Sequence, residues 1–245
     1  MLICHLSDWH ASLTSLPEAD IYVVTGDMLP NFPETSFRIP GGGEGVLHER
    51  DRWPEGAIYM GRKIIRELEV RGQREWCEMN PFREATGIPD SKPVVCVRGN
   101  HDFVDLGPWI GGNVWEISED PTRVAEISGL VFGGMRGIPW CTGEWMDELY
   151  PDGMESRARN LPHDIDVLVT HAPPEGILDI GRYFENIGSP EIMSYVHRRS
   201  YAVEGLPLRP LRAHFFGHLH NNAGGKNMGG VVFSNAAETM RMVEL

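Results

Sequence analysis

Five short apolar runs, each followed at once by a polar cluster, constrain this chain more than any other feature. The runs cover residues 2–6, 21–25, 94–98, 167–170 and 214–216. They are too short for typical helices and rich in residues that favour β-structure, so they predict buried strands. In layered α/β proteins, functional side chains gather at the carboxyl ends of such strands.

The polar clusters contain residue types that bind metals. They are Asp8 with His10, Gly26-Asp27, Gly99-Asn100-His101-Asp102, His171, and Gly217-His218-Leu219-His220. Each cluster alone also fits an ordinary turn or loop, because Gly, Asn and Asp tolerate left-handed backbone conformations. Their combination predicts a site, since carboxylate, amide and imidazole groups complement one another around a metal.

Hydrolysis of a phosphate ester near neutral pH needs a hydroxide, which two cations about 3.5–4 Å apart can generate. One carboxylate must bridge the two ions, and we assign this bridge to Asp27. Asp8, His10 and His220 are expected to complete one ion, and Asn100, His171 and His218 the other. This ligand set suits manganese, iron or zinc better than calcium or an all-thiolate zinc site. His101 is then available as the general acid that protonates the leaving alkoxide.

In this order the clusters resemble the calcineurin-like metallophosphoesterases, whose pattern is Asp-x-His, Gly-Asp, Gly-Asn-His-Asp/Glu, a strand-end His and Gly-His-x-His. The match runs from Asp8 to His220. The resemblance implies an α/β fold, a four-layer sandwich of two mixed β-sheets flanked by α-helices. It also implies a catalytic role for Arg98, because the protein phosphatases of this family carry an Arg before Gly-Asn-His that holds a substrate phosphate oxygen.

Within that family, three later stretches are most similar to the small single-domain phosphodiesterases of the metallophosphoesterase-domain-containing group. These stretches are residues 138–140, 166–174 and 176–179. The protein-phosphatase branch shows Gly-Asp-x-x-Asp-Arg-Gly at the second cluster, whereas this chain has Gly-Asp-Met-Leu-Pro-Asn-Phe. We therefore expect a phosphodiesterase that works by in-line attack of a metal-bridging hydroxide. A phosphomonoesterase, a metal-dependent nuclease and a noncatalytic interaction module are the alternatives.

Composition limits the kinds of molecule that this chain is expected to bind. The formal net charge of −13 disfavours nucleic acid, which needs clustered Lys and Arg, and favours a small phosphate-ester substrate. The chain shows no run of 18 apolar residues and no signal peptide, and its four cysteines form no Cys-x-x-Cys pair. These features predict a cytoplasmic protein with free thiols and no membrane partner. The oligomeric state stays open.

We expect a single metallophosphoesterase domain over residues 1–245, interrupted by a Gly/Pro-rich insertion at about 28–56. Such an insertion is typical of a substrate-selecting lid or of a flexible loop. A helix should follow over residues 57–79, with Gly72 as a position that divides it. Trp140 and Trp145 flank a later loop and could line a pocket for an aromatic leaving group or simply anchor the core.

Overall fold

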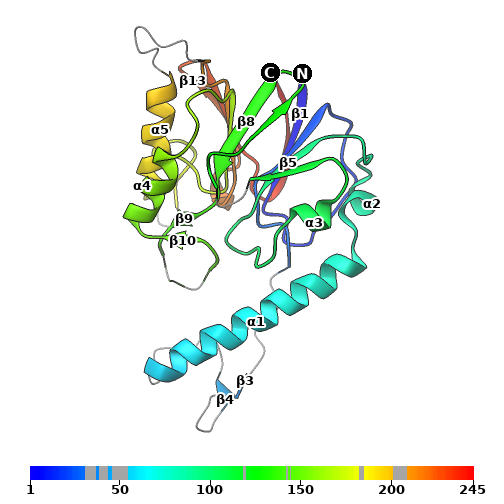
Figure 1. Ribbon diagram of the computed structural model, residues 1–245, viewed down its shortest axis with the longest axis vertical. Helices are drawn as coiled ribbons and strands as arrows, with labels where there is room; N and C mark the ends of the chain where they lie inside the picture. Colours follow the sequence, from blue (N-terminus) through cyan, green and yellow to red (C-terminus); the bar gives the residue numbers. More distant parts are fainter. Residues whose placement is uncertain are drawn as a thin grey trace.

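Two mixed β-sheets pack face to face (Figure 1). The computed structural model describes residues 1–30, 37–38, 44–45, 55–117, 120–141, 143, 145–181, 185–200 and 209–245. The first sheet has the order β15-β1-β2-β5-β6 and the second the order β13-β14-β12-β11-β8-β7. In both sheets the central strands run parallel, and antiparallel pairs lie at the edges.

The first sheet contains β1 (Leu2–Ser7), β2 (Ile21–Val24), β5 (Val94–Val97), β6 (Val114–Ile117) and β15 (Thr239–Glu244). The second contains β7 (Val124–Ile127), β8 (Leu130–Met135), β11 (Val167–Thr170), β12 (Ala213–Phe216), β13 (Gly224–Met228) and β14 (Val231–Asn235). Two short pairs stand apart, β3 (Phe37–Arg38) with β4 (Glu44–Gly45), and β9 (Ile138–Pro139) with β10 (Glu148–Leu149). The five strands that the apolar runs predict are confirmed as β1, β2, β5, β11 and β12, and all of them belong to the parallel parts of the sheets.

These strands are buried on both faces, and their apolar side chains contribute to three core layers. One layer lies between the two sheets, and one lies on the outer face of each sheet. Alternate residues of a strand point to opposite faces, so Val95 of β5 packs between the sheets while Cys96 packs on the other side of its sheet. In β12, Phe215 lies between the sheets and Phe216 beneath the helices. Three apolar layers imply four structural layers, which confirms the predicted sandwich.

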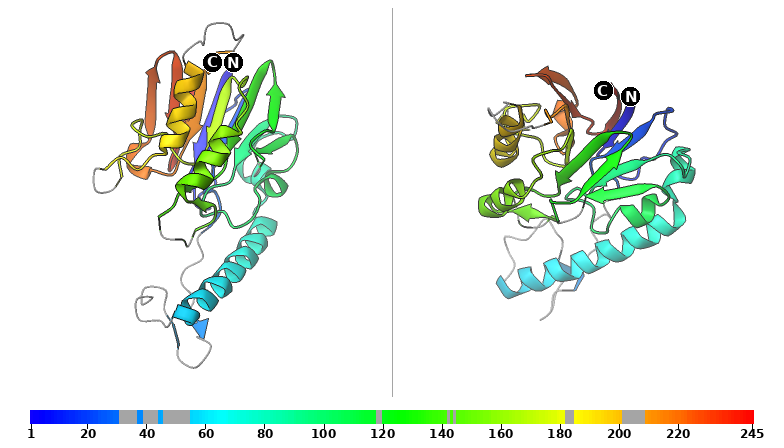
Figure 2. Two further views of the ribbon diagram at one scale, coloured as in Figure 1. Left: turned by 60° about the vertical axis from the view of Figure 1, so that its left-hand side comes forward. Right: turned by 45° about the horizontal axis from the view of Figure 1, so that its top comes forward.

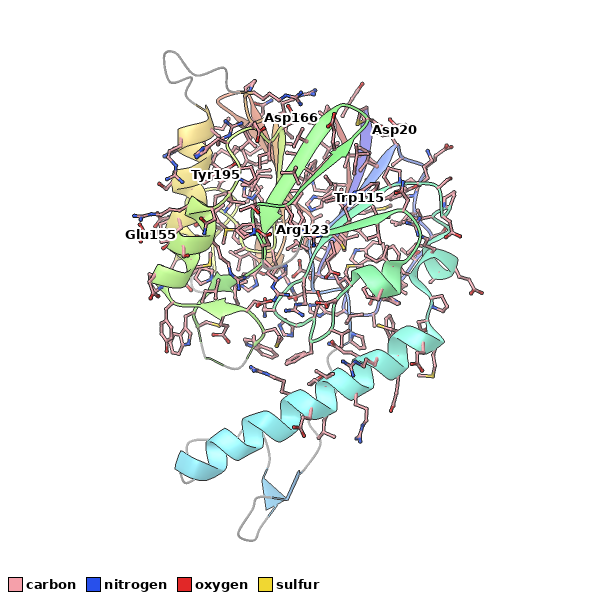
Figure 3. All side chains as sticks on the ribbon, viewed as in Figure 1. Asp20, Trp115, Arg123, Glu155, Asp166 and Tyr195 are labelled. Carbon is pink, nitrogen blue, oxygen red and sulfur yellow. The ribbon has the colours of Figure 1, made fainter. Side chains whose placement is uncertain are left out.

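Helices form the two outer layers. On the second sheet lie α4 (Pro151–Arg159) and α5 (Pro190–Ser200), and Tyr195 of α5 is buried toward that sheet whereas Glu155 of α4 is exposed (Figure 3). On the first sheet lie α2 (Phe82–Thr86) and α3 (Gly107–Ile110), which contribute Phe82 and Trp109 to the core. A 3-10 turn at His220–Asn222 follows β12.

The helix α1 (Glu55–Met79) is a single continuous helix that extends from the sandwich (Figure 2). The prediction that Gly72 divides it is wrong, because a helical glycine costs only about 1 kcal/mol and the adjacent Gln73 anchors the helix to the sandwich. The predicted insertion at 28–56 lies largely outside the described residues, although β3 and β4 fall within it. Its role as a lid stays a prediction.

No helix within the described part of the chain is long and apolar enough to cross a membrane. The four cysteines form no disulfide, as the sequence predicts. The cytoplasmic location and the single-domain organisation stay predictions.

Candidate metal centre

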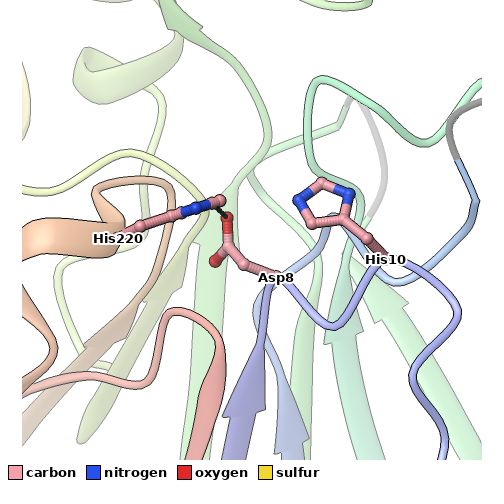
Figure 4. A group of neighbouring side chains, drawn as sticks. All are labelled: Asp8, His10 and His220. Carbon is pink, nitrogen blue, oxygen red and sulfur yellow. Dashed lines mark hydrogen bonds and ion pairs between the residues drawn. The ribbon is translucent and has the colours of Figure 1, made fainter.

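Two groups of potential metal ligands lie at the ends of the central strands. Asp8, His10 and His220 form the first group (Figure 4), and each offers a ligand atom within 4.8 Å of the others. Asp8 and His10 follow β1, while His220 follows β12 of the other sheet. The carboxyl ends of strands from both sheets therefore meet at this group.

Asp27, His171 and His218 form the second group, with ligand atoms again within 4.8 Å of one another. His171 Nε2 lies 3.2 Å from Asp27 Oδ2 and 3.0 Å from Asn100 Oδ1. The seven residues predicted as ligands thus fall into the two sets that the sequence assigns, with Asn100 beside the second. Whether Asp27 bridges two ions stays a prediction.

Each acidic ligand is held through one oxygen and offers the other. Asp8 Oδ2 accepts hydrogen bonds from Ser7 Oγ (2.5 Å) and the His218 amide (2.9 Å), which leaves Oδ1 facing His220. Asp27 Oδ1 accepts the His101 amide at 2.7 Å, which leaves Oδ2 facing His171. The loops thereby aim one lone-pair oxygen of each carboxylate at the candidate site.

The imidazoles are oriented in the same way. His171 Nδ1 donates to the Thr25 carbonyl at 2.6 Å, so Nε2 is left as the lone-pair nitrogen that faces Asp27 and Asn100. His220 Nδ1 lies 3.0 Å from Glu238 Oε1, and its Nε2 faces Asp8 at 3.2 Å. Acceptor atoms that converge in this way repel one another unless a cation or a proton lies between them. The residues present therefore fit a metal site.

The protonation of the second group supports this fit. Burial alone would raise the pKa of Asp27, but the facing His171 outweighs it and holds that pKa well below its ordinary value. Burial likewise lowers the pKa of His171, but the Asp27 carboxylate raises it by more. His171 is therefore protonated, and its positive charge faces the Asp27 carboxylate, as that of a bound cation would. Burial lowers the pKa of His218 to about 4, so this residue is the neutral imidazole that metals bind.

The backbone at the ligands is strained. Asp8, His10, Asp27 and His218 adopt positive φ angles of 57°, 41°, 52° and 71°, which non-glycine residues seldom adopt. Hydrogen bonds between the loops maintain this conformation, including those from the Asp8 amide to the Gly26 carbonyl and from the His10 amide to the Asp27 carbonyl.

Two motif glycines are required by close approach to these ligands. A Cβ on Gly99 would lie 2.1 Å from Asp27 Oδ1, and one on Gly217 would lie 2.3 Å from Asp8 Oδ2. Any side chain at either position would displace the carboxylate of a proposed ligand. Steric fit therefore requires glycine at both motif positions, whatever the conformation of the turn.

The loop that carries His101 is fixed by Asp102. The Asp102 carboxylate is fully buried and accepts four amide hydrogen bonds, from Asp27, Met28, Leu29 and Gly99, at 2.7–3.0 Å. It therefore joins the two loops that follow β2 and β5. The half-buried His101 ring lies beside His10, with ring centroids 5.2 Å apart.

Arg98 lies at the end of β5 among carboxylates. Its Nη2 is 2.9 Å from Asp147 Oδ2 and its Nη1 is 3.0 Å from Asp105 Oδ1. Its predicted contact with a substrate phosphate stays a prediction.

Three residues at the site had no signal in the sequence, namely Gln73, Asp147 and Glu238. They lie apart in the chain from the site residues that they contact and belong to no recognisable motif. Glu238 lies beside His220. It provides the carboxylate that an arrangement of acid, imidazole and metal requires behind the histidine. Only its proximity in space identifies it.

A four-layer sandwich with acidic and imidazole ligands gathered at its strand ends defines the class of the metallophosphoesterases. The chain belongs to the calcineurin-like phosphoesterase family, whose model matches residues 1–222.

Curated relatives agree with this assignment. The chain is 29% identical over 112 residues to metallophosphoesterase domain-containing protein 1 of Homo sapiens and of Mus musculus, which covers 45% of this chain and 32% of each relative. It is 31% identical over 192 residues to a UPF0046 protein of Caenorhabditis elegans, which covers 68% of this chain and 58% of that protein. The match thus spans about a third of the mammalian relatives.

Proposed function

We propose that this chain is a dinuclear metal-dependent phosphoesterase that prefers phosphodiesters. The observation that carries the proposal is the presence of two three-residue groups at the ends of parallel strands. Within each group, the candidate ligand atoms lie within 4.8 Å of one another. Both groups present acceptor atoms that a pair of cations would satisfy. The family match supports the reaction class, and the diester preference rests on the argument from Arg98 below.

The proposed ligands are divided between two cations. Asp8, His10 and His220 would hold one cation, Asn100, His171 and His218 the other, and Asp27 both. When bound, the cations would supply a nucleophile at neutral pH and offset charge on the phosphate, and the metal is Mn, Fe or Zn. The Thr25 carbonyl and Glu238 keep two of the imidazoles in the tautomer that presents Nε2 to the site.

His101 would donate the proton that the leaving oxygen takes up. Its backbone is fixed on both sides, because its amide donates to Asp27 and its carbonyl accepts from Gln73 Nε2 at 2.7 Å. The half-buried ring therefore stays beside His10, where an ester oxygen bound at the site would come within reach.

The preference for diesters follows from the surroundings of Arg98. A phosphomonoester is largely dianionic at neutral pH and gains from a guanidinium that is free to bind it, whereas a diester carries one negative charge. The Arg98 guanidinium is already paired with Asp147 and Asp105. This arrangement leaves less positive charge for a dianion.

The proposal is tested by removing bound metal with a chelator and adding back Mn²⁺, Fe²⁺ or Zn²⁺ one at a time. We expect bis(p-nitrophenyl) phosphate to be hydrolysed faster than p-nitrophenyl phosphate with at least one metal, and elemental analysis to find two ions per chain. Asp27→Ala should lower this number below two and abolish turnover, whereas Asp164→Ala, at an exposed carboxylate, should change neither. Faster monoester hydrolysis would refute the diester preference, and inactivity with every metal would refute the enzyme.

A further inference from the structure

The loop that connects β9 to β10 is closed at its base. We define the 140–148 loop by its described residues, namely Trp140, Cys141, Gly143 and 145–148. Its ends are joined by the β9–β10 pair and by hydrogen bonds from the Ile138 amide to the Asp147 carbonyl (3.1 Å) and from the Trp140 amide to the Leu149 carbonyl (2.9 Å). The two ends of the loop therefore lie side by side in the β9–β10 pair.

One carboxylate organises the inside of this loop. Glu148 accepts the amides of Cys141 (2.9 Å), Gly143 (2.7 Å) and Trp145 (2.8 Å). Hydrogen bonds to an ionised acceptor are stronger than neutral ones, so three of them fix the backbone of the loop. Glu148 thus holds the backbone of Trp145 in place.

Two further contacts attach the loop to the strand end that carries His101. The Met146 amide donates to the Asn100 carbonyl at 3.0 Å. The Asp147 carboxylate, only 10% exposed, lies 2.9 Å from Arg98 Nη2 and 3.3 Å from Arg136 Nε. The loop belongs to the β9–β10 pair, which follows β8 of the second sheet in the chain, and Asn100 follows β5 of the first sheet. These contacts therefore join the two sides of the sandwich at the candidate site.

These contacts bring Trp145 against His101. The two ring centroids are 4.1 Å apart with an angle of 39° between the rings, and the next ring beyond His101 is the proposed ligand His10, at 5.2 Å. Trp145 is only partly buried. A group that departs beside His101 would therefore meet an accessible indole.

We propose that Trp145 is a specificity-determining residue that binds a flat aromatic leaving group, such as a nucleobase or an aryl ring, by stacking. Asp147 and Glu148 are positioning residues that act through it. The inference rests on the proposed function, because it takes His101 as the proton donor to the leaving group. Stacking on tryptophan favours a planar ring over a saturated ring of the same size.

The test compares two diesters whose leaving alcohols have similar acidity but different shape, dibenzyl phosphate and bis(cyclohexylmethyl) phosphate. In the metal-loaded protein, kcat/KM should be higher for the dibenzyl ester. Trp145→Leu should reduce the ratio of the two kcat/KM values about five- to tenfold, mainly through KM, and Trp145→Phe should retain most of it.

Trp140→Leu is the matched control. It removes an indole from the same loop, but Trp140 stacks on Tyr150 and is 45% exposed. It should leave the ratio unchanged. An equal loss on both esters in Trp145→Leu would overturn the inference while leaving the proposed function intact, whereas failure of the unaltered protein to hydrolyse any diester would overturn the proposed function.

The positioning role has its own test. Asp147→Asn and Glu148→Gln should each lower the ratio less than Trp145→Leu does, with folding checked by near-ultraviolet circular dichroism. Adding Asp147→Asn to Trp145→Leu should lower the ratio no further, because both changes act through the same contact. Additive losses would show that Asp147 acts by another route and would overturn its assignment.

Discussion

Single hydrogen bonds decide which atoms face the proposed metal centre. His171 and His220 each have one nitrogen engaged by a protein acceptor, so the other nitrogen points to the carboxylates of Asp27 and Asp8. The ligand types alone would not produce this convergence. The acceptors behind the ligands select one tautomer of each ring.

Glu238→Gln tests this at the first group. The change keeps the shape of the side chain but removes the charge that orients His220, and loss of such a partner typically weakens metal binding 10–100-fold. Because the Glu238 side chain is 61% exposed, we expect about tenfold weaker retention of Zn²⁺ or Mn²⁺ in a chelator competition titration. Glu244→Gln, at an exposed glutamate of the same strand region, is the control. Unchanged affinity in Glu238→Gln would show that solvent, and not this carboxylate, sets the orientation of His220.

His101→Ala tests the proposed proton donor. A general acid contributes about 10²–10⁴-fold to a reaction with a poor leaving group and little to one whose leaving group is already stable. We therefore expect kcat to fall by about 10²-fold or more on dibenzyl phosphate and far less on bis(p-nitrophenyl) phosphate. His163→Ala, at an exposed histidine, should change neither rate. Equal losses on both substrates would reject the role.

At the scale of elements, one side chain joins α1 to the site. Gln73 is fully buried and donates from Nε2 to the carbonyls of His101 and Pro30, while its Oε1 accepts the Phe103 amide at 2.7 Å. The same helix packs Trp76 against Trp109 of α3, with ring centroids 5.5 Å apart. Its carboxyl-terminal half is thus part of the sandwich.

Gln73→Leu tests how much these hydrogen bonds contribute to the free energy of unfolding. The change leaves three backbone groups without their partner, one buried (the Phe103 amide) and two partly buried (the His101 and Pro30 carbonyls). An unsatisfied buried group costs roughly 1–3 kcal/mol before relaxation. We expect the free energy of unfolding, measured by urea denaturation, to fall by about 3 kcal/mol. Arg74→Leu, at the exposed neighbouring position, should change it by less than about 0.5 kcal/mol. Similar shifts in both variants would mean that the helix is not anchored through Gln73.

At the scale of the whole molecule, two buried histidines couple folding to pH. His214 donates from Nε2 to Thr170 Oγ1, because that hydroxyl gives its own hydrogen to the Ala172 carbonyl. Its Nδ1 has no hydrogen-bond partner among the described residues, and burial lowers the pKa of His214 to about 3. His5 lies between Ser234 and Thr25, and burial lowers its pKa well below the ordinary value.

The sign of the pH dependence follows from these directions. An unfolded histidine binds a proton below about pH 6.5, whereas folded His214 stays neutral until about pH 3. The unfolded state therefore binds more protons in this interval, and stability falls as the pH falls, by about 1.4 kcal/mol per pH unit for each such residue.

His214→Phe removes one of these titrating groups. The side chain lies among Phe216 and Phe233, so a phenyl ring matches its surroundings. Between pH 7.5 and pH 5 the variant should lose about 2 kcal/mol less stability than the unaltered protein, as measured by urea denaturation at each pH. Parallel pH curves would show that His214 does not resist protonation in the folded state.

The sequence by itself determined five of the central strands and the order of the proposed ligands along the chain. A fully buried parallel strand needs a continuous apolar run, and a ligand at its end must follow that run directly, so both features are local in the chain. The family match over residues 1–222 agrees with this pattern. By contrast, Gly72 misled the helix prediction because local propensity is weaker than tertiary anchoring.

Only the tertiary structure decided which residues support the ligands. The pairs Asp27 with His171, His220 with Glu238, and Arg98 with Asp147 join residues from different strand ends and loops. The supporting carboxylates Glu238 and Asp147 belong to no local periodicity or motif, and each could have been an ordinary surface charge. What places them is the packing of two sheets, which brings loops far apart in the chain within hydrogen-bonding distance.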